Sequence, residues 1–147
     1  MGRSAFALFL LVPLAACQQA APPDVKDVWT RATAGSAANA AVYMTIRSQT
    51  ADRLLAASTP AAKKTDLMTM TGDGGAMGMK YLTAIDIPAG QPVTLNAGGL
   101  HVWLAGLNQP LTAGQSIPLT LKFEKAGDRQ VTVTIVAPAA MPPMPGM

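Results

Sequence analysis

Cysteine is almost absent from this chain of 147 residues, which contains only Cys17. One cysteine cannot form an internal disulfide, so a folded domain must be held by its own hydrophobic core. Between two atypical ends lie about 110 to 120 residues, a length that can bury such a core. No internal repeat is visible, and we expect a single domain over residues 25–136.

Charge and aromatic side chains are also scarce, at 13% and 5% of the sequence. Basic residues are spread along the chain, and Lys63 and Lys64 form the one adjacent pair. A nucleic-acid-binding surface needs a basic stripe interleaved with aromatic residues. The sequence therefore predicts no nucleic-acid partner.

The usual signatures of catalysis are missing as well. His101 is the only histidine, and no recognisable motif pairs it with a nucleophile. Carboxylates are not clustered at metal-ligand spacing, and no glycine-rich phosphate loop follows a predicted strand. We therefore expect a protein that is not an enzyme.

The first sixteen residues have the pattern of an export signal. Arg3 precedes an apolar run over residues 5–14, and small residues follow it. The run is shorter than the roughly 20 apolar residues that cross a bilayer as a helix. Residues 1–16 are therefore interpreted as a signal peptide that is removed.

Cys17 follows this signal directly. The sequence Leu14-Ala15-Ala16-Cys17 resembles a bacterial lipobox, which implies a lipidated Cys17 and a membrane anchor in the periplasm. The alternative is an ordinary secretory signal that leaves a free thiol, a liability in an oxidising compartment. Gln18 in place of aspartate favours the outer membrane, and residues 17–24 are rich enough in alanine and proline to serve as a tether.

The other end, residues 137–147, consists mostly of proline, alanine and methionine. Its proline density excludes a helix or a central strand. Met141, Met144 and Met147 are spaced by three, so a polyproline II conformation would align them on one edge as an auxiliary thioether site. The other interpretation is a disordered tail that happens to contain methionine, and the sequence leaves both open.

Short runs rich in Val, Ile, Leu, Thr and Tyr alternate with turn residues through the domain. This pattern predicts an all-β sandwich or barrel. The expected strands are 28–32, 41–47, 53–58, 65–70, 79–82, 92–95, 101–105, 119–125 and 130–136. Ala126-Gly127-Asp128 is the expected turn between the last two.

Alternation within the strands separates core positions from candidate functional ones. In the strand that follows the loop 96–99, Leu100, Val102 and Leu104 share one face, whereas His101 and Trp103 share the opposite face. By the same rule Met68 and Met70 share a face of their strand. Met77 and Met79 do so in the next.

Methionine replaces the larger aliphatic residues between positions 67 and 80. Four methionines occur there among frequent glycines, whereas a core would mix in Leu, Ile and Val. Taken singly, each is most simply a packing residue. Together, two thioethers and one imidazole favour Cu(I) over Zn(II), Mg(II) or Ca(II). The candidate copper ligands are Met68, Met79 and His101, and Trp103, Met70 and Met77 are possible further ligands or a cover.

The domain also resembles a known family along most of its length. The similar segments are 29–32, 41–46, 85–90, 98–104, 106–111 and 119–127. They resemble the periplasmic PCuA(C)-type copper chaperones. The resemblance implies a cupredoxin-like Greek-key β-sandwich that binds one Cu(I) through a motif written H(M)-x10-M-x21-H-x-M.

Three positions of that motif match this sequence. Met68 is the permitted variant of its first histidine, and Met79 and His101 follow after gaps of ten and twenty-one residues. Trp103 stands where the family usually has a methionine. The fourth ligand of the motif is therefore missing, but three ligands can hold Cu(I), and Met70 can supply a substitute sulfur. Trp103 either covers the metal by a cation–π contact or only packs beside the site.

The resemblance implies a chaperone that carries Cu(I) toward the CuA site of cytochrome c oxidase. We expect it to be a monomer. Its implied partners are a Sco-type chaperone and oxidase subunit II. A Cu(I) buffer or resistance lipoprotein remains an alternative, and a metal-free envelope sandwich is disfavoured by the methionine placement. Blue-copper electron transfer needs a cysteine thiolate, and Cys17 lies at the lipidated end.

A site with one histidine predicts a weak dependence of Cu(I) binding on pH. Thioethers do not titrate, so His101 is the only one of the three ligands that has to lose a proton. We expect Cu(I) binding to persist to lower pH than at a site with two histidines. Proton release measured during a Cu(I) titration checks this, and two protons displaced per metal would contradict it.

Overall fold

The computed structural model describes residues 21–73 and 76–138, and only the backbone of Asp73, Ala76 and Met77. The described part contains ten strands and confirms the all-β expectation. They are β1 (Asp24–Arg31), β2 (Asn39–Arg47), β3 (Asp52–Ser58), β4 (Ala62–Asp73), β5 (Ala76–Leu82), β6 (Ile85–Ile87), β7 (Pro92–Leu95), β8 (Leu100–Leu107), β9 (Ser116–Phe123) and β10 (Gly127–Val136).

The signal peptide, Cys17 and the tail methionines Met141, Met144 and Met147 lie outside the described residues. Their expected roles therefore stay predictions. Within the described part, no helix has the length and apolar character needed to cross a membrane.

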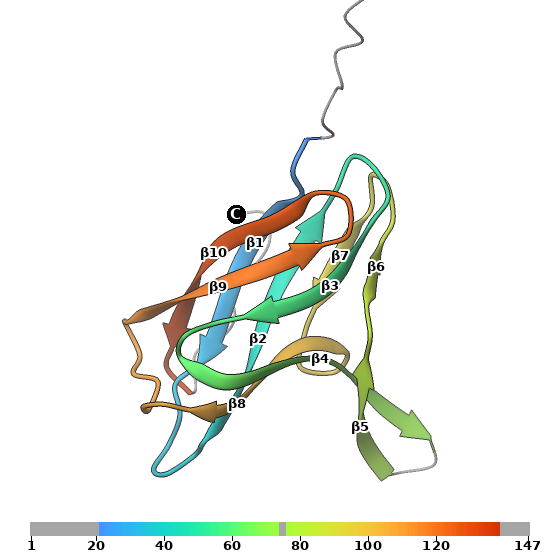
Figure 1. Ribbon diagram of the computed structural model, residues 1–147. Coiled ribbons are helices and arrows are strands. Elements are labelled where there is room, and N and C mark those ends of the chain that lie inside the picture. Colours follow the sequence, from blue (N-terminus) through green and yellow to red (C-terminus); the bar gives the residue numbers. More distant parts are fainter. Residues whose placement is uncertain (1–20, 74–75, 139–147) are drawn as a thin grey trace, which may run out of the picture.

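The strands join in the order β5-β4-β8-β2-β1-β10-β9-β3-β6, and β7 pairs with β2 beside β8. Most neighbours are antiparallel, whereas β1 and β10 run parallel. Figure 1 shows that the sheet folds over itself, so that β10, β9 and β3 lie in front of β1 and β2. The hairpin of β4 and β5 reaches the lower right of that view, with β5 at the end of the strand order.

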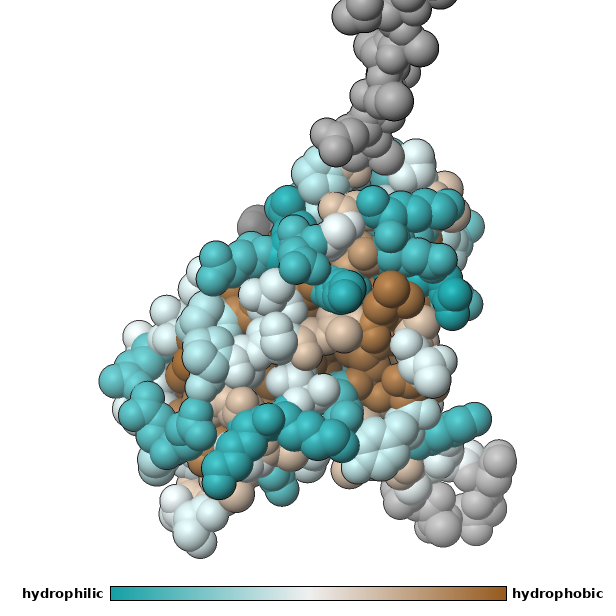
Figure 2. Space-filling view, viewed as in Figure 1, coloured by the Kyte–Doolittle hydropathy of each residue, from teal (hydrophilic) through white to brown (hydrophobic). Residues whose placement is uncertain are grey.

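The two layers enclose one apolar core, as alternation predicts. Met44 and Ile46 of β2 meet Leu119, Leu121 and Phe123 of β9 within a single buried cluster. On the outside, hydrophilic residues cover much of the face in Figure 2, and an apolar area is visible near β6. The core thus lies on one side of β2 and β8, and the side chains on the other side of these strands face away from it.

Strand boundaries differ from the sequence expectation mainly by extension. β4 spans Ala62–Asp73 and β5 Ala76–Leu82, so the expected strands 65–70 and 79–82 were too short. β1 begins at Asp24, the residue at which the expected tether ends. β6 was not expected, because its three residues form a strand only through pairing with β3. Cross-strand hydrogen bonds, which local sequence does not reveal, set these limits.

Asp52 organises the turn between β9 and β10 from a neighbouring strand. Its Oδ1 accepts the backbone N–H groups of Arg53 and Lys125 at 2.8 and 2.9 Å, and its Oδ2 accepts that of Ala126 at 3.0 Å. Burial alone raises the pKa of Asp52, but these hydrogen bonds, with the Lys125 charge, outweigh it and hold the pKa below its ordinary value. The ionised carboxylate therefore stabilises the fold.

Replacement of Asp52 tests this role. Asp52→Ala leaves three backbone donors without their acceptor, and we expect the free energy of unfolding to fall by about 3 kcal/mol. A depressed pKa contributes stability above the ordinary carboxyl pKa of about 4, and this is lost as pH falls further. In urea unfolding measured from pH 7 to 3, the free energy of unfolding of the parent chain should fall as the pH falls. The fall should be smaller in Asp52→Ala.

Asp86→Ala is the matched control, because the exposed Asp86 carboxylate makes only a surface ion pair with Arg53 at 3.2 Å. Equal losses of stability in Asp52→Ala and Asp86→Ala would contradict the assignment.

Candidate metal centre

Three adjacent strands, β5, β4 and β8, bring the candidate ligands together. Met68 of β4 lies directly opposite His101 of β8, and Met70 lies directly opposite Met79 of β5. Directly opposite residues share a face, with Cβ atoms about 5 Å apart. Since Met68 and Met70 are two residues apart on one strand, all four side chains lie on the same face.

This face is the one turned away from the core. Leu67 of β4 and Val102 and Leu104 of β8 belong to the buried apolar cluster, as the alternation of β8 predicts. Met68 is only 2% exposed, yet it lies outside that cluster. Its burial is therefore due to its neighbours on the outer face.

The four side chains differ sharply in exposure. Met68 and His101 are 2% and 3% exposed, whereas Met79 is 48% exposed. These residues lie within strands, and Met68 and His101 are buried there. The arrangement offers a buried thioether at Met68 and a buried imidazole at His101, with a half-buried thioether at Met70 and an exposed one at Met79.

One backbone carbonyl sets the orientation of the imidazole. The oxygen of Gly99 lies 3.0 Å from His101 Nδ1 and also accepts the N–H of Met70 at 3.1 Å. A carbonyl oxygen can only accept a hydrogen bond, so Nδ1 carries the hydrogen. In the neutral imidazole the lone pair is then on Nε2, which is the form a metal-binding histidine needs.

The loop before β8 fixes the position of that carbonyl. Asn96 Oδ1 accepts the N–H of Gly98 at 3.0 Å, and the carbonyl of Asn96 accepts the N–H of Gly99 at 3.1 Å. The N–H of Asn96 donates to Leu100 at 2.9 Å, which closes the loop. The expected glycine-rich loop next to His101 is thus a hydrogen-bonded turn that aims the Gly99 carbonyl at the ring.

Aromatic rings border His101 on the same face. The ring centroids of Tyr43 and Trp103 lie 6.5 and 6.2 Å from that of His101, both in edge orientations. Burial raises the pKa of Tyr43, and the charge of Arg31 only partly offsets this. Tyr43 is therefore a neutral neighbour for the imidazole at physiological pH.

Trp103 lies opposite Asp66 in the β4–β8 ladder, next to a charged pair. Asp66 Oδ2 contacts Lys64 Nζ at 3.0 Å, and this hydrogen bond and charge raise the pKa of Lys64. The Lys64 ammonium lies 5.2 Å from the ring centroid of Tyr81, which stands opposite Met68. Trp103 thus has His101 on one side and the Lys64–Asp66 ion pair on the other.

The remaining candidates are placed less fully. Met77 pairs with Gly72 in the ladder, and its side chain lies outside the described part of the structure. Across residues 21–73 and 76–138, with the side chains noted above excepted, no three His, Cys, Asp or Glu side chains gather as a metal cluster. Among the described residues, the soft donors of this face are thioethers and one imidazole, and the Asp66 carboxylate on the same face is paired with Lys64.

Sequence reasoning missed three neighbours of the site: Tyr43, Tyr81 and the Gly99 carbonyl. Tyr43 lies in an expected strand, but only the pairing of β2 with β8 brings it beside His101. Tyr81 lies two residues after Met79, so alternation alone would have placed both on one face. No sequence signal marks a particular backbone carbonyl as an acceptor.

The chain belongs to the LpqE-like family. The family model described as "Putative lipoprotein LpqE-like" matches residues 24–135. A relative from Leifsonia xyli subsp. xyli, described as "Putative lipoprotein Lxx21020", is 31% identical over 120 residues, which cover 80% of this chain and 72% of the relative.

Solved PCuAC domains share the fold. The apo PCuAC domain from PmoF1 has a TM-score of 0.69 and 27% identity, with 81% of this chain and 97% of that domain covered. The solution structure of CuI-DR1885 from Deinococcus radiodurans has a TM-score of 0.64 and 34% identity, with 84% and 85% covered. The expected resemblance to PCuA(C)-type proteins is thus confirmed for the family and the fold.

The role of the loop predicts the effect of Asn96→Ala on His101. Loss of the Asn96 Oδ1 acceptor should cost about 1 kcal/mol and loosen the Gly99 carbonyl. In the metal-free parent chain, nitrogen NMR should show the neutral ring of His101 with its hydrogen on Nδ1. Asn96→Ala should increase the share of the Nε2–H form.

Asn108→Ala is the control for this experiment. Asn108 Nδ2 donates a hydrogen bond of 2.6 Å to the Pro60 carbonyl, and this bond is not part of the loop 96–99. A neutral His101 protonated mainly on Nε2 in the parent chain would overturn the assigned orientation.

Proposed function

We propose that this protein is a Cu(I) chaperone of the bacterial envelope. The observation that carries the proposal is the convergence of Met68, Met79 and His101 on one face of β5, β4 and β8. The spacing of these residues matches the copper motif, and solved relatives of the same fold include one described with Cu(I). Soft thioether and imidazole ligands suit Cu(I).

In this proposal Met68, Met79 and His101 Nε2 form a three-coordinate site. Met70, directly opposite Met79, can supply a further sulfur. Trp103 covers the site from the His101 side, where its indole lies edge-on to the imidazole. In the layer beneath, Leu67 of β4 and Val102 of β8 face the core and lie directly opposite each other.

The unequal exposure of the ligands suits transfer by ligand exchange. Met79 is the exposed ligand, so its bond to Cu(I) is the first that an incoming donor can replace. A sulfur or nitrogen donor of the acceptor forms one bond to Cu(I) as the Met79 bond breaks, and no change of oxidation state is needed. Met68 and His101 then release the ion in turn, each as a further donor of the acceptor binds it.

The acceptor in this proposal is the CuA site on subunit II of cytochrome c oxidase, with a Sco-type chaperone as a second partner. The protein acts as a monomer, held at the periplasmic side of a membrane by lipid on Cys17. The description of the family and of its relative as lipoproteins supports the anchor. The outer membrane is the proposed location because Gln18 follows the lipidated cysteine.

A Cu(I) buffer or resistance lipoprotein is the second candidate. The methionines at positions 141, 144 and 147 favour it, because extra thioethers would add capacity. Deletion of the gene separates the two functions. If the deletion strain loses oxidase activity and added copper restores it, the chaperone function is supported. If the strain loses copper tolerance but keeps normal oxidase activity, the buffer function is supported.

Substitution of methionine by leucine tests the site without removing bulk. Met68→Leu and Met79→Leu keep approximate volume but lose the sulfur. In Cu(I) competition titrations we expect each to raise the Kd at least about tenfold, equivalent to about 1.4 kcal/mol. His101→Ala should weaken binding at least as strongly. Met44→Leu is the control, because Met44 is a core residue 1% exposed on the opposite side of the sheet.

Unchanged affinity in Met79→Leu and His101→Ala would defeat the site. Trp103→Met distinguishes the roles of the indole, since tighter binding would mean that Trp103 occupies a lost ligand position. A chain that ends at Val136 should bind less copper per molecule if the tail holds a second ion.

A further inference from the structure

β1 and β10 are paired over only a short length. The described register between them is confined to Trp29, Thr30 and Arg31 against Thr134, Ile135 and Val136. Before these residues β1 pairs with β2, and β10 pairs with β9. The facing edges of the two strands therefore separate over Val25–Val28 and Val131–Thr132.

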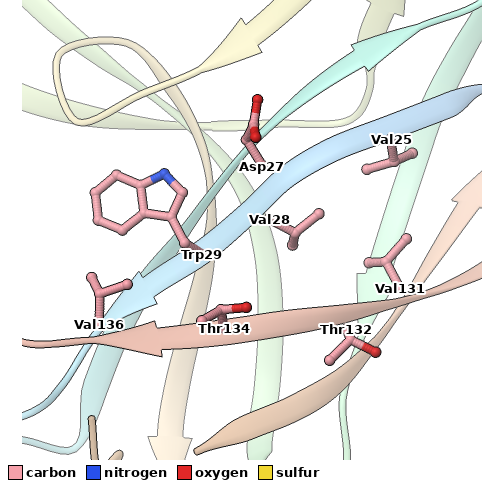
Figure 3. A pocket seen from close by; sticks show the side chains of 8 residues that line it. All are labelled: Val25, Asp27, Val28, Trp29, Val131, Thr132, Thr134 and Val136. Carbon is pink, nitrogen blue, oxygen red and sulfur yellow. The ribbon is translucent and has the colours of Figure 1, made fainter. Parts of the chain in front are cut away.

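A groove of about 650 Å³ occupies this separation. Figure 3 shows Val25 and Val131 at one end and Val136 at the other, with Trp29 beside Val136. Most of its lining side chains are apolar, and Asp27 is its one charged member among the described residues. The groove is thus an apolar strip on the sheet, with an aromatic wall near the end of β10.

The irregular path of β1 creates the groove. Asp27 has a φ of 52°, a left-handed conformation that is uncommon for a residue other than glycine. The register with β2 shifts between Lys26 and Trp29, as at a β-bulge. A bulge bends its strand, so β1 pairs with β2 on both sides of the irregularity, whereas only its last part also pairs with β10.

We propose that the segment of residues 139–147 docks in this groove. The segment follows Pro138 directly, and Val136, two residues earlier, itself lines the groove. Its residues are alanine, methionine, proline and glycine, without a charged side chain. An uncharged, apolar segment attached at the end of an apolar groove binds at high effective concentration.

The length of the segment fits. Val25 lies four residues before Trp29, or about 13 Å along β1 at 3.3 Å per residue. Nine residues in polyproline II conformation span about 28 Å. The segment can therefore reverse direction after Pro138 and still extend past Val25.

The side chains fit as well. Proline cannot donate to a sheet ladder, but polyproline II segments bind grooves lined by aromatic residues. Methionine sulfur makes favourable contacts with an aromatic ring. Trp29 offers the edge of such a ring to the groove, because it is only 7% exposed. Its indole is tilted by 49° against the Tyr43 ring, with 4.8 Å between centroids, and Arg31 Cζ lies 5.8 Å from the Trp29 ring centroid.

Docking would also place the tail on the face that carries the candidate metal centre. Trp29 lies directly opposite Tyr43, and the Tyr43 ring borders His101. The docking itself does not depend on copper, so its test is made on the metal-free protein. Failure of the copper proposal would leave it intact.

The experiment is NMR of the chain with Cys17→Ser, which prevents lipidation, and with ¹³C-labelled methionine methyl groups. In the metal-free protein, methyls of Met141, Met144 and Met147 should show NOE contacts to Trp29 and Val131. Removal of residues 139–147 should shift the amide resonances of Val25–Trp29 and leave those of Leu121 in β9 unchanged.

Two substitutions on β10 make a matched pair. Thr132→Glu places a charge in the groove, whereas Gln130→Glu places one on the same strand outside it. Both positions are exposed, so neither change disturbs the core. Thr132→Glu should abolish the NOE contacts, and Gln130→Glu should preserve them.

Three results would overturn the proposal. The first is that the tail methyls in the parent chain show no NOE contact with the groove, and the second is that Gln130→Glu abolishes the contacts as completely as Thr132→Glu. The third is that a mixture of differently labelled chains shows contacts between two copies. The last result would identify the groove as a self-association surface.

Discussion

The carbonyl oxygen of Gly99 is the acceptor on which the arrangement of the candidate centre depends. It accepts the N–H of Met70 from β4 and lies 3.0 Å from Nδ1 of His101 in β8, so one atom links the two strands and orients the ring. Because a carbonyl cannot donate, the hydrogen is fixed on Nδ1 and the lone pair on Nε2. The hydrogen bonds of the Asn96 turn hold the carbonyl in place.

The candidate ligands on this face differ in their exposure to solvent. Met68 and His101 are buried, with the Tyr43 and Trp103 rings edge-on to His101, whereas Met79 on the end strand is exposed. A cargo ion held in the proposed way would be anchored by two protected donors and released through the third. The same sheet continues through Tyr43 to Trp29, so the Trp29 end of the β1–β10 groove lies on the face of the candidate centre.

Alternation in the sequence predicted much of this correctly. Val102 and Leu104 are in the core, His101 is on the other face, and Met68 and Met70 share a side of β4. Strand limits were less predictable: β6 exists only because it pairs with β3, and the ends of β4 depend on β5 and β8. The burial of Met68 and His101 was missed because their covering side chains come from other strands.

The sequence by itself determined the all-β class, the two faces of each strand and the soft donor types, since these depend on local composition and a period of two residues. Only the tertiary structure decided that Met68 stands opposite His101, that Met79 is the exposed donor and that β1 separates from β10. These are consequences of strand register and of the bulge at Asp27, which arise from hydrogen bonds between residues far apart in the chain.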